Sequence, residues 1–443
     1  MPRPVFPFAP RVMLVATVFA LAACAQTKVA APPVETQPVP VVEAPAPAPV
    51  AAPLAESVPA EPDVVRVGLM VPLTGSAAGV GRDLLDASQL ALFDFSPDRF
   101  ELRIYDSGSN PIIAASAAAR AQQDGVRLLL GPLFADAVSA TANVMRPQGV
   151  PIYAFSSDRL VGGNGVYVAG FFPEAQIART VDFAARRGMF QFASLVPDDA
   201  FGGRMTTIFA DAVSDAGGDI IEQRFYPFDN EGMTATVRSL ARYDERAEEL
   251  ETERARLAEN DDPISKRALE RLETLDTLGE VGFEALMLPE GGAQILQLAP
   301  LLAFFDIDPV QVKLLGTWIW DDPALGKEPS MLGAWFAAPP REARLLFVDR
   351  FRKTYGRAPD RLATLAYDGI ALAAVLAQST GPDGNPYGAA KLENPDGFAG
   401  VDGILRLHAT GEVERGLSVL EIGRDGPYEI DPAPTSFEKP VTN

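Results

Sequence analysis

Apolar and polar residues follow two alternating patterns from residue 64 onward. Short apolar runs such as "VVRVGLMV" and "RLLLGPL" are typical of buried strands. Segments between them carry apolar residues at helical spacing, and the Ala-rich segment 110–125 has Pro111 near its start and Gly125 at its end. Strand and helix in alternation, joined by short loops, predict a parallel α/β sheet. Segment 403–426 alternates with turn signals instead, which predicts a β-hairpin.

The pattern starts again near residue 173, which indicates a second copy of the architecture rather than one very wide sheet. The part that follows residue 63 has roughly 380 residues, more than one domain usually contains. We therefore predict two doubly wound, Rossmann-like α/β lobes around a cleft between them. The predicted division is a first lobe of 64–172 plus about 321–396, a second lobe of 173–320 plus about 397–430, and a tail at 431–443.

The segment 240–278 interrupts the alternation with two helical patterns in succession. Its apolar residues mark two stripes, Leu240, Tyr243, Ala247, Leu250 and Leu257 in the first and Ile264, Ala268, Leu272 and Leu275 in the second. Asp262 and Pro263 provide the start of the second helix. We predict an antiparallel helical hairpin inserted into the second lobe. Its charged faces are either simply solvated or form a docking surface for a partner.

The N-terminus has the features of a lipoprotein signal peptide. Arg3 and Arg11 flank an apolar stretch that is short for a membrane span, and the stretch ends at "LAAC". Small residues before a cysteine resemble a bacterial lipobox, so residues 1–23 are predicted to be removed and Cys24 to carry lipid. An ordinary signal peptide with a chance cysteine, or a membrane anchor, remains the alternative. Gln26, in place of Asp, favours the outer membrane over the inner one, on the periplasmic side of the envelope.

Residues 24–63 consist almost entirely of Ala, Pro, Val and Glu after the cysteine. Such a composition does not bury a core and predicts a semi-extended spacer that rises about 3 Å per residue. Fully extended, the spacer reaches on the order of 100 Å. We interpret it as a tether that lets the folded part work away from the membrane, with a low-complexity tail of no function as the alternative.

Composition excludes several classes of function. The formal net charge of −21 disfavours nucleic acid and anionic lipid surfaces as partners, so contact with the membrane is expected through the N-terminal lipid alone. Cys24 is the only cysteine and His408 the only histidine, which leaves no disulfide, no His-cluster metal site and no catalytic thiol. No P-loop is present either. We therefore expect no enzyme activity, no catalytic residues, no cofactor and no metal.

Candidate ligand contacts follow from the rule that doubly wound sheets bind ligands beyond the carboxyl ends of their strands. Loops at these positions mix aromatic residues, hydroxyls and carboxylates, as binding sites do. The candidate cleft residues are Thr74, Gly75, Ser76, Leu133, Phe134, Ser156, Ser157, Phe172, Asp199, Phe201, Glu290, Trp320 and Asp321. Whether a small molecule binds there is left open by the sequence.

Several phrases resemble type I periplasmic binding proteins of the leucine-binding class. "VRVGLMVPLTGSAAGVGRDLLDASQLAL" is similar to the first strand, loop and helix of that class, and "VPDDAFGG" is similar to a phrase of its second lobe. The resemblance extends over nearly all of residues 64–430. It implies the type I periplasmic binding fold, with two lobes and a ligand cleft.

Within that class, the sequence is most similar to lipoprotein activators of penicillin-binding proteins. The phrases that carry this likeness are "GPLFADAVSATANVMRPQGVPIYAFSSD", "LAYDGIALAAVL" and "GFAGVDGILRLHATGEVERGLSVLEI". The resemblance implies a non-enzymatic protein that binds and stimulates a penicillin-binding protein, a bifunctional peptidoglycan synthase. The alternative is a lipid-anchored solute receptor of an ABC importer, for an amino acid or a related small ligand.

The sequence departs from the amino-acid receptors of the class at the carboxylate grip. Leu133 and Phe134 have no side-chain groups that hydrogen-bond a carboxylate, although Ser156 and Ser157 do. An acid such as Glu290 or Asp321 would have to pair with a ligand ammonium, and Phe201 would cover the ligand from the second lobe. Half of the expected grip is absent, which argues against the binding of free amino acids.

Overall fold

A computed structural model describes residues 64–95, 100–378 and 385–437, all of which belong to one compact unit, Ala60–Asn443. The predicted signal peptide, Cys24 and the predicted tether lie outside the described residues, as does the end of the predicted tail. Within the described residues, the chain forms three β-sheets, of five, seven and three strands.

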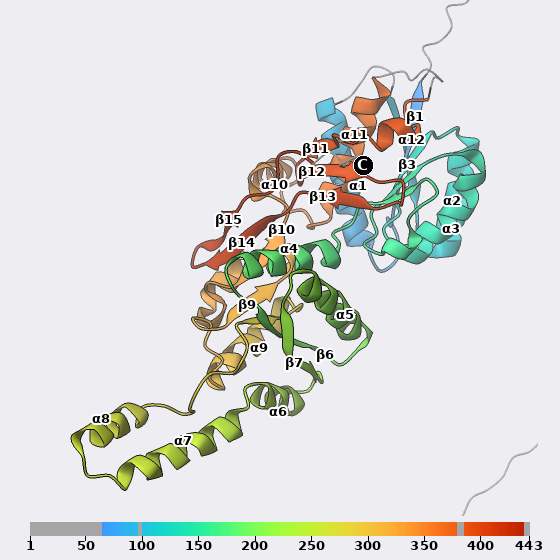
Figure 1. Cartoon of the computed structure of the whole chain (residues 1–443). Helices are drawn as coiled ribbons and strands as arrows, with labels where there is room; N and C mark the ends of the chain where they lie inside the picture. The colour runs from blue at the N-terminus through green and yellow to red at the C-terminus, as the bar shows by residue number, and fades with distance from the viewer. Residues whose placement is uncertain (1–63, 96–99, 379–384, 438–443) are drawn as a thin grey trace, which may run out of the picture. The chain divides into compact units, whose positions relative to one another are not determined.

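The first sheet has five parallel strands in the order β2-β1-β3-β4-β5. Its strands are β1 (Val65–Val71), β2 (Phe100–Asp106), β3 (Leu128–Leu130), β4 (Ile152–Ala154) and β5 (Val166–Val168). Both faces are covered by helices, which are α1 (Ala78–Phe95) and α11 (Ala363–Ala377) on one face and α2 (Pro111–Gln123) and α3 (Ala135–Met145) on the other (Figure 1). Side chains of β1 alternate between the two covers, Leu69 toward α1 and α11 and Met70 toward α2 and α3, because successive residues of a strand face opposite sides.

The second sheet has seven strands in the order β15-β14-β10-β9-β8-β6-β7. Its strands are β6 (Gln191–Pro197), β7 (Asp219–Tyr226), β8 (Ala285–Met287), β9 (Lys313–Gly316), β10 (Trp335–Ala338), β14 (Ser418–Gly423) and β15 (Gly426–Asp431). Strands β6 to β10 are parallel, and β14 and β15 add an antiparallel edge. The covering helices are α4 (Pro173–Arg186) and α5 (Ala200–Asp215) on one face and α6 (Asn230–Leu240) and α9 (Gly292–Phe304) on the other.

A small antiparallel sheet completes the part that packs on the first sheet. It consists of β11 (Phe398–Gly400), β12 (Gly403–Leu407) and β13 (Val413–Arg415). Leu405, Leu407 and Val413 lie in the same core as β1 and α11. We call the five-stranded sheet with its helices and this small sheet the first lobe, and the seven-stranded sheet with its helices the second lobe. The remaining short helices are η1 (Arg146–Gln148), η2 (Arg159–Val161), η3 (Trp318–Trp320), η4 (Pro323–Lys327), η5 (Pro329–Met331) and α12 (Ala389–Leu392).

The predicted architecture of two doubly wound α/β lobes is confirmed, but the chain is divided between them differently from the prediction. Strand β10 lies in the 321–396 range assigned to the first lobe, yet it pairs with β9 and β14 of the second. Strands β11 to β13 lie in the 397–430 range assigned to the second lobe, yet they pack on the first. A short apolar run shows that a strand exists and says nothing about which of two sheets it joins.

The predicted hairpin at 403–426 is therefore two hairpins. Strands β12 and β13 pair with each other in the first lobe, and β14 and β15 pair in the second. The chain passes between the lobes in the two residues Gly416 and Leu417. It also passes between them at 169–172, from β5 to α4, and at 339–340, from β10 to α10 (Arg341–Tyr355). The lobes are thus joined by these three connections between elements, and after β15 the chain returns to the first lobe, where the guanidinium of Arg406 lies over the ring of Phe437.

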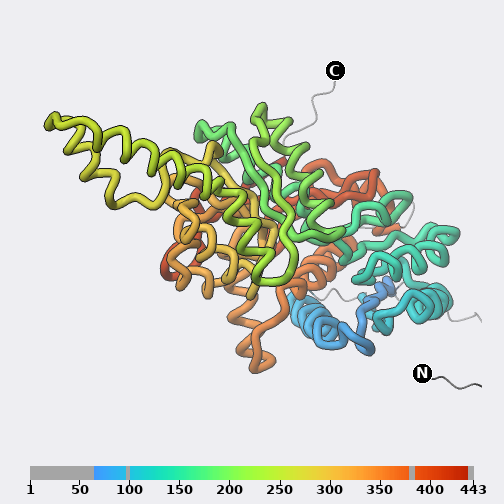
Figure 2. The backbone as a smooth tube through the Cα atoms, turned by 90° about the horizontal axis from the view of Figure 1, so that it is seen from below, coloured from blue at the N-terminus to red at the C-terminus, as the bar shows by residue number. Residues whose placement is uncertain are grey.

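Two helices, α7 (Tyr243–Ala258) and α8 (Pro263–Leu272), occupy the segment predicted as an inserted hairpin. They extend away from the sheets of both lobes (Figures 1 and 2). Arg254 joins the two helices, because its guanidinium donates to the carbonyls of Leu272 at 2.7 Å and Leu275 at 3.0 Å. The carboxylate of Asp262 accepts the first free N–H groups of α8, as its position in the sequence predicts.

Candidate functional site

A pocket of about 570 Å³ is lined by residues of both lobes. The first lobe contributes the ends of β3, β4 and β5, and the second contributes the first turns of α4 and α5 with the loops after β8 and β9. The largest side chains of the lining are aromatic, namely Phe134, Phe155, Phe171, Phe201 and Trp318. The rings of Phe171 and Trp318 contact each other, with centroids 5.3 Å apart. The pocket is therefore mainly apolar.

Tight backbone packing holds the ends of β4 and β5 against each other on one side of the pocket. The N–H of Gly170 donates to the carbonyl of Ser156 at 2.9 Å. A Cβ atom at Gly170 would lie 2.3 Å from that carbonyl oxygen, so only glycine allows the approach. This packing places Ser156 and Ser157 in the lining.

Five of the residues predicted for the cleft line this pocket. Leu133 and Phe134 follow β3, Ser156 and Ser157 follow β4, and Phe201 lies in the first turn of α5 on the opposite lobe. Ser156 is buried and its hydroxyl accepts the N–H of Asp158 at 3.1 Å, which leaves its O–H available as a donor. The two strand ends and Phe201 thus come together although they are far apart in the sequence.

The predicted residues of the loop after β1 do not line the pocket. Thr74 is bound to Asp106 at the end of β2, with its hydroxyl donating at 2.6 Å and its N–H at 3.2 Å. Gly75 and Ser76 are exposed beside it. This loop is held at the rim of the first sheet by the carboxylate of Asp106.

Phe172, Trp320 and Asp199 are also absent from the lining, because each has a structural partner. Phe172 is buried in the core beneath α2 and α3, with the guanidinium of Arg159 over its ring. Trp320 is fully buried and donates from Nε1 to the carbonyl of Glu290 at 2.6 Å. Asp199 caps α5 by accepting the N–H of Gly202 at 2.9 Å.

Neither acid that the sequence suggested as an ammonium partner reaches the pocket lining. The Asp321 side chain is only 4% exposed and pairs with Arg341 at 2.9 Å and with Arg344. Burial raises the pKa of Glu290, and Asp199 raises it further, against a hydrogen bond from Tyr226 that lowers it. Asp321 is therefore committed to arginines, and Glu290 is disfavoured as an anion.

Two aromatic residues that the sequence predicted for the pocket, Phe172 and Trp320, are close neighbours in the chain of the residues that line it. Phe171, rather than Phe172, lines the pocket, and Trp318, rather than Trp320, does so. The consecutive Phe residues face opposite sides of the chain, and the sequence has no signal that distinguishes them. The sequence did not predict Gln176 as a pocket residue. Gln176 is 1% exposed, and its Oε1 accepts the N–H of Trp318 at 2.8 Å. Only its position in the first turn of α4, after a strand end, suggests it.

The polar groups of the pocket combine several hydrogen-bond donors with one carboxylate, that of Asp158, whose Oδ1 accepts the N–H of Leu160 at 3.0 Å. Gln176 keeps its amide N–H groups, because its oxygen is occupied, and Thr317 and Arg204 also lie in the lining. Helices α3 and α4 both begin at the pocket without a side chain capping them from the N-cap position, so N–H groups of their first turns add partial positive charge, which the carboxylates of Asp136 and Glu174 in the same turns partly offset. Such a site favours a ligand that has an apolar body and an acceptor group, a carboxylate in particular.

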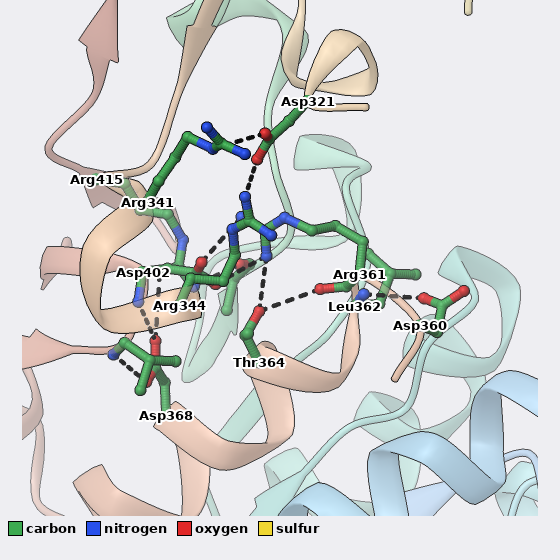
Figure 3. Close-up of polar contacts among 12 residues, drawn as sticks. Asp321, Arg341, Arg344, Asp360, Arg361, Leu362, Thr364, Asp368, Asp402 and Arg415 are labelled. Atoms are coloured by element: carbon green, nitrogen blue, oxygen red, sulfur yellow. Dashed lines mark hydrogen bonds and ion pairs between the residues drawn. The ribbon is translucent and has the colours of Figure 1, made fainter. Parts of the chain in front are cut away.

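A buried group of charged residues, which we call the Arg–Asp network, contacts the ring of Phe171 through Arg361 and Arg415. Figure 3 shows the network. Its members are Asp321, Arg341, Arg344, Arg361, Asp368, Asp402 and Arg415. Arg361 and Asp402 form its best-defined pair, with Nη2 and Oδ1 2.9 Å apart. The Arg361 guanidinium also stacks on the ring of Phe171, 4.3 Å from its centroid. The network is thus in direct contact with the wall of the pocket.

Two aspartates of the network have pKa values displaced in opposite directions. Burial raises the pKa of Asp402, but the guanidinium groups of Arg361 and Arg415 outweigh burial and hold it below the usual value. Burial raises the pKa of Asp368, and the neighbouring Asp402 carboxylate raises it further, against Arg415. Asp402 is therefore the ionised member and Asp368 the one that takes up a proton.

Within residues 64–95, 100–378 and 385–437, no group of three or more His, Cys, Asp or Glu side chains has the arrangement of a metal site. Over the same residues, no helix is both long and apolar enough to span a membrane.

Comparison with known proteins relates the chain to binding proteins. Residues 64–427 match a family model described as "Periplasmic binding protein". Among curated proteins, "Penicillin-binding protein activator LpoA" of Pectobacterium parmentieri is 29% identical over 126 residues, which are 28% of this chain and 18% of that protein. The chain thus spans less than a fifth of the length of this relative.

Solved structures show the same fold at low sequence identity. A putative branched-chain amino acid ABC transporter protein from Rhodospirillum rubrum has a TM-score of 0.65 at 18% identity and covers 83% of this chain and 100% of its own. A solute binding protein of an ABC transporter from Rhodopseudomonas palustris, in complex with 3,4-dihydroxybenzoic acid, has a TM-score of 0.58 at 18% identity and covers 86% of this chain and 99% of its own.

Proposed function

Because this chain belongs to the periplasmic binding protein family, we propose that it is a binding protein without catalytic activity and that its partner is a penicillin-binding protein. In this proposal, lipid on Cys24 and the spacer at 24–63 hold the two lobes at the periplasmic side of the envelope, at the outer membrane. There the protein binds a bifunctional peptidoglycan synthase and activates it.

The similarity to LpoA over 126 residues is the observation that carries the proposal. The pocket supports it indirectly. Asp321 pairs with Arg341 and Arg344 and does not face the pocket, so this carboxylate is not available to the ammonium group of an amino-acid ligand. Asp321 therefore gives no support to a receptor for free amino acids, and Asp158, the acid that does line the pocket, already accepts the N–H of Leu160 through Oδ1.

The helices α7 and α8 are our proposed docking surface for the synthase. Along α7, Glu245, Glu248, Glu249 and Glu253 recur at three- and four-residue spacing, so they share one face. With Thr252 and Leu278 they line an open groove of about 560 Å³. Such a face fits a Lys- or Arg-rich segment of the partner, because opposite charges steer encounter and set register. In α8 no residue is buried, which leaves its apolar side chains available to the same partner.

Charge reversal on α7 tests both parts of the proposal. The full chain is added to the purified synthase of the same organism, and glycan polymerisation and cross-linking are measured. We expect stimulation by the unchanged protein. For the double variant Glu248→Lys, Glu249→Lys we expect the concentration that gives half-maximal stimulation to be at least tenfold higher, which corresponds to about 1.4 kcal/mol or more. The matched control is Asp211→Lys, Asp215→Lys, which makes the same charge change on the exposed side of α5.

The two parts of the proposal fail separately. Absence of stimulation by the unchanged protein contradicts activation of a synthase. Full stimulation by the Glu248→Lys, Glu249→Lys variant contradicts only the docking surface and leaves the charged face of α7 as a solvated one.

A second candidate function, a solute receptor of an importer, is favoured by the pocket itself. Its aromatic walls and hydrogen-bond donors fit a small carboxylate with an apolar body. Fluorescence of Trp318 in the wall provides the measurement. Under this function, benzoate gives a saturable change and L-phenylalanine, which adds an ammonium group to the same ring, binds at least tenfold more weakly. Equal binding of the two, or none of either, contradicts it.

A further inference from the structure

The three connections between the lobes pass close to the Arg–Asp network, and buried charged groups of the network bind or flank each of them. The connections are 169–172, 339–340 and 416–417. Connections of this kind are where two lobes bend when they open and close. The contacts that the network makes with each connection therefore decide whether such bending is free or restrained.

Arg415 joins the first connection to the third. It is the last residue of β13, directly before the third connection, and its side chain is 5% exposed. Its Nη2 donates to the carbonyl of Ala169 in the first connection at 3.0 Å. Its Nη1 lies 3.9 Å from Oδ2 of Asp368 in α11. One buried guanidinium thus holds two of the connections against a helix of the first lobe.

The second connection is held from both sides. Arg341 and Arg344 follow it in α10 and pair with Asp321, which lies in the second lobe after η3. On the other side, the turn between β11 and β12 contains Asp402 and leads into Gly403, the first residue of β12. A Cβ atom at Gly403 would lie 2.9 Å from Cδ of Pro340, so this turn is packed directly on the connection.

Arg361 links the contacts around Asp321 with those around Arg415. It precedes α11, pairs with Asp402 and donates to the hydroxyl of Thr364 at 2.9 Å. Its guanidinium also lies over the ring of Trp318 in η3, 5.8 Å from the centroid, and the carbonyl of Trp318 accepts the N–H of Asp321 at 2.9 Å. The network is therefore continuous from Asp321 to Arg415 (Figure 3).

Relative movement of the lobes separates charged partners that are largely shielded from water, since the side chains of Asp321, Arg344 and Arg341 are 4%, 10% and 19% exposed. Bending at the second connection pulls Asp321 of the second lobe away from Arg341 and Arg344 of the first, whereas Ala169 and Arg415 both belong to the first lobe and stay together. A buried charge that loses its partner is strongly disfavoured, whereas two exposed charges that separate are solvated at little cost. The arrangement of the lobes that keeps these pairs together therefore has a lower free energy than arrangements that separate them.

We propose that the Arg–Asp network locks the two lobes in one relative arrangement, so that the pocket does not open and close as a ligand enters or leaves. The inference is independent of which of the two candidate functions holds. A partner that binds this protein then meets one fixed surface, and a small molecule in the pocket does not change that surface by closing the lobes.

Distance measurement between spin labels tests the lock. Ser139→Cys on α3 and Thr207→Cys on α5 place one label on an exposed position of each lobe, in the full chain with Cys24→Ser. We expect a single narrow distance distribution for this protein. Asp321→Asn keeps the shape of the side chain but removes its charge, and we expect it to widen the distribution at least twofold or to add a second peak.

Two further variants make the result decisive. Arg341→Gln acts at a side chain that is 19% exposed, so it tests the lock if Asp321→Asn does not fold. Asp349→Asn removes an exposed partner of Lys353 on the same helix α10 and is expected to leave the distribution unchanged. A broad or two-peaked distribution with the network intact overturns the proposal, and so does an unchanged narrow distribution in Asp321→Asn or, if that variant is unfolded, in Arg341→Gln.

Discussion

Replacement of Asp402 by Asn is the change to which the fold is predicted to be most sensitive. The Asp402 side chain is fully buried and holds Arg361 by two contacts, at 2.9 and 3.3 Å. Asparagine has nearly the same shape but no charge, so Arg361 and Arg415 lose their ionised neighbour while they stay buried. Removal of one partner from a buried ion pair costs about 3–5 kcal/mol, because the desolvated charge that remains is uncompensated.

Urea unfolding, followed by circular dichroism and by tryptophan fluorescence, measures this loss. With a denaturant slope of about 3 kcal/mol per molar, the expected loss lowers the midpoint by about 1 to 1.7 M. Asp349→Asn is the control, because it removes an exposed partner of Lys353 four residues away in α10 and is worth about 0.5 kcal/mol or less. If Asp402→Asn moves the midpoint no further than this control does, the reasoning on the buried network is refuted.

Two other predictions concern Asp368 of the network and Gly170 beside the pocket. Burial raises the pKa of Asp368 from 3.8 in the unfolded chain to about 7 in the folded protein, so folding takes up a proton between these values and the free energy of unfolding falls as pH rises through them. Between pH 5 and pH 8 this fall should be smaller in Asp368→Asn than in the unchanged protein, and equal slopes in urea titrations contradict this. Gly170→Ala should destabilise the fold by about 1–3 kcal/mol, because its Cβ would lie 2.3 Å from the carbonyl of Ser156. Gly203→Ala, where a Cβ meets nothing within 4 Å, should cause no loss of melting temperature, and a similar loss in both variants counts against the packing argument.

Local patterns predicted much of the fold. Buried strands such as β1 and β6 read as apolar runs, and α7 and α8 read as two helical stripes, because each signal lies within a few consecutive residues. The strand-end rule also located part of the pocket, since Ser156 and Phe201 do line it. The assignment of β10 to the wrong lobe shows the limit of such patterns. Four apolar residues pair equally well with either sheet, and the choice depends on which strand edge the other strands leave unpaired.

Amino-acid sequence alone determined that this chain forms alternating strands and helices in two lobes, because the period of the apolar residues is a local property. Tertiary structure alone decided that Asp321 meets Arg341 and Arg344, and that Arg415 reaches both Asp368 and the carbonyl of Ala169. These partners are separated by 20 to 246 residues in the chain. Acidic and basic residues are common, and nothing local distinguishes a solvated one from a buried one. Packing of three distant connections against one another removes water from this place, and only then do charge pairs there become strong.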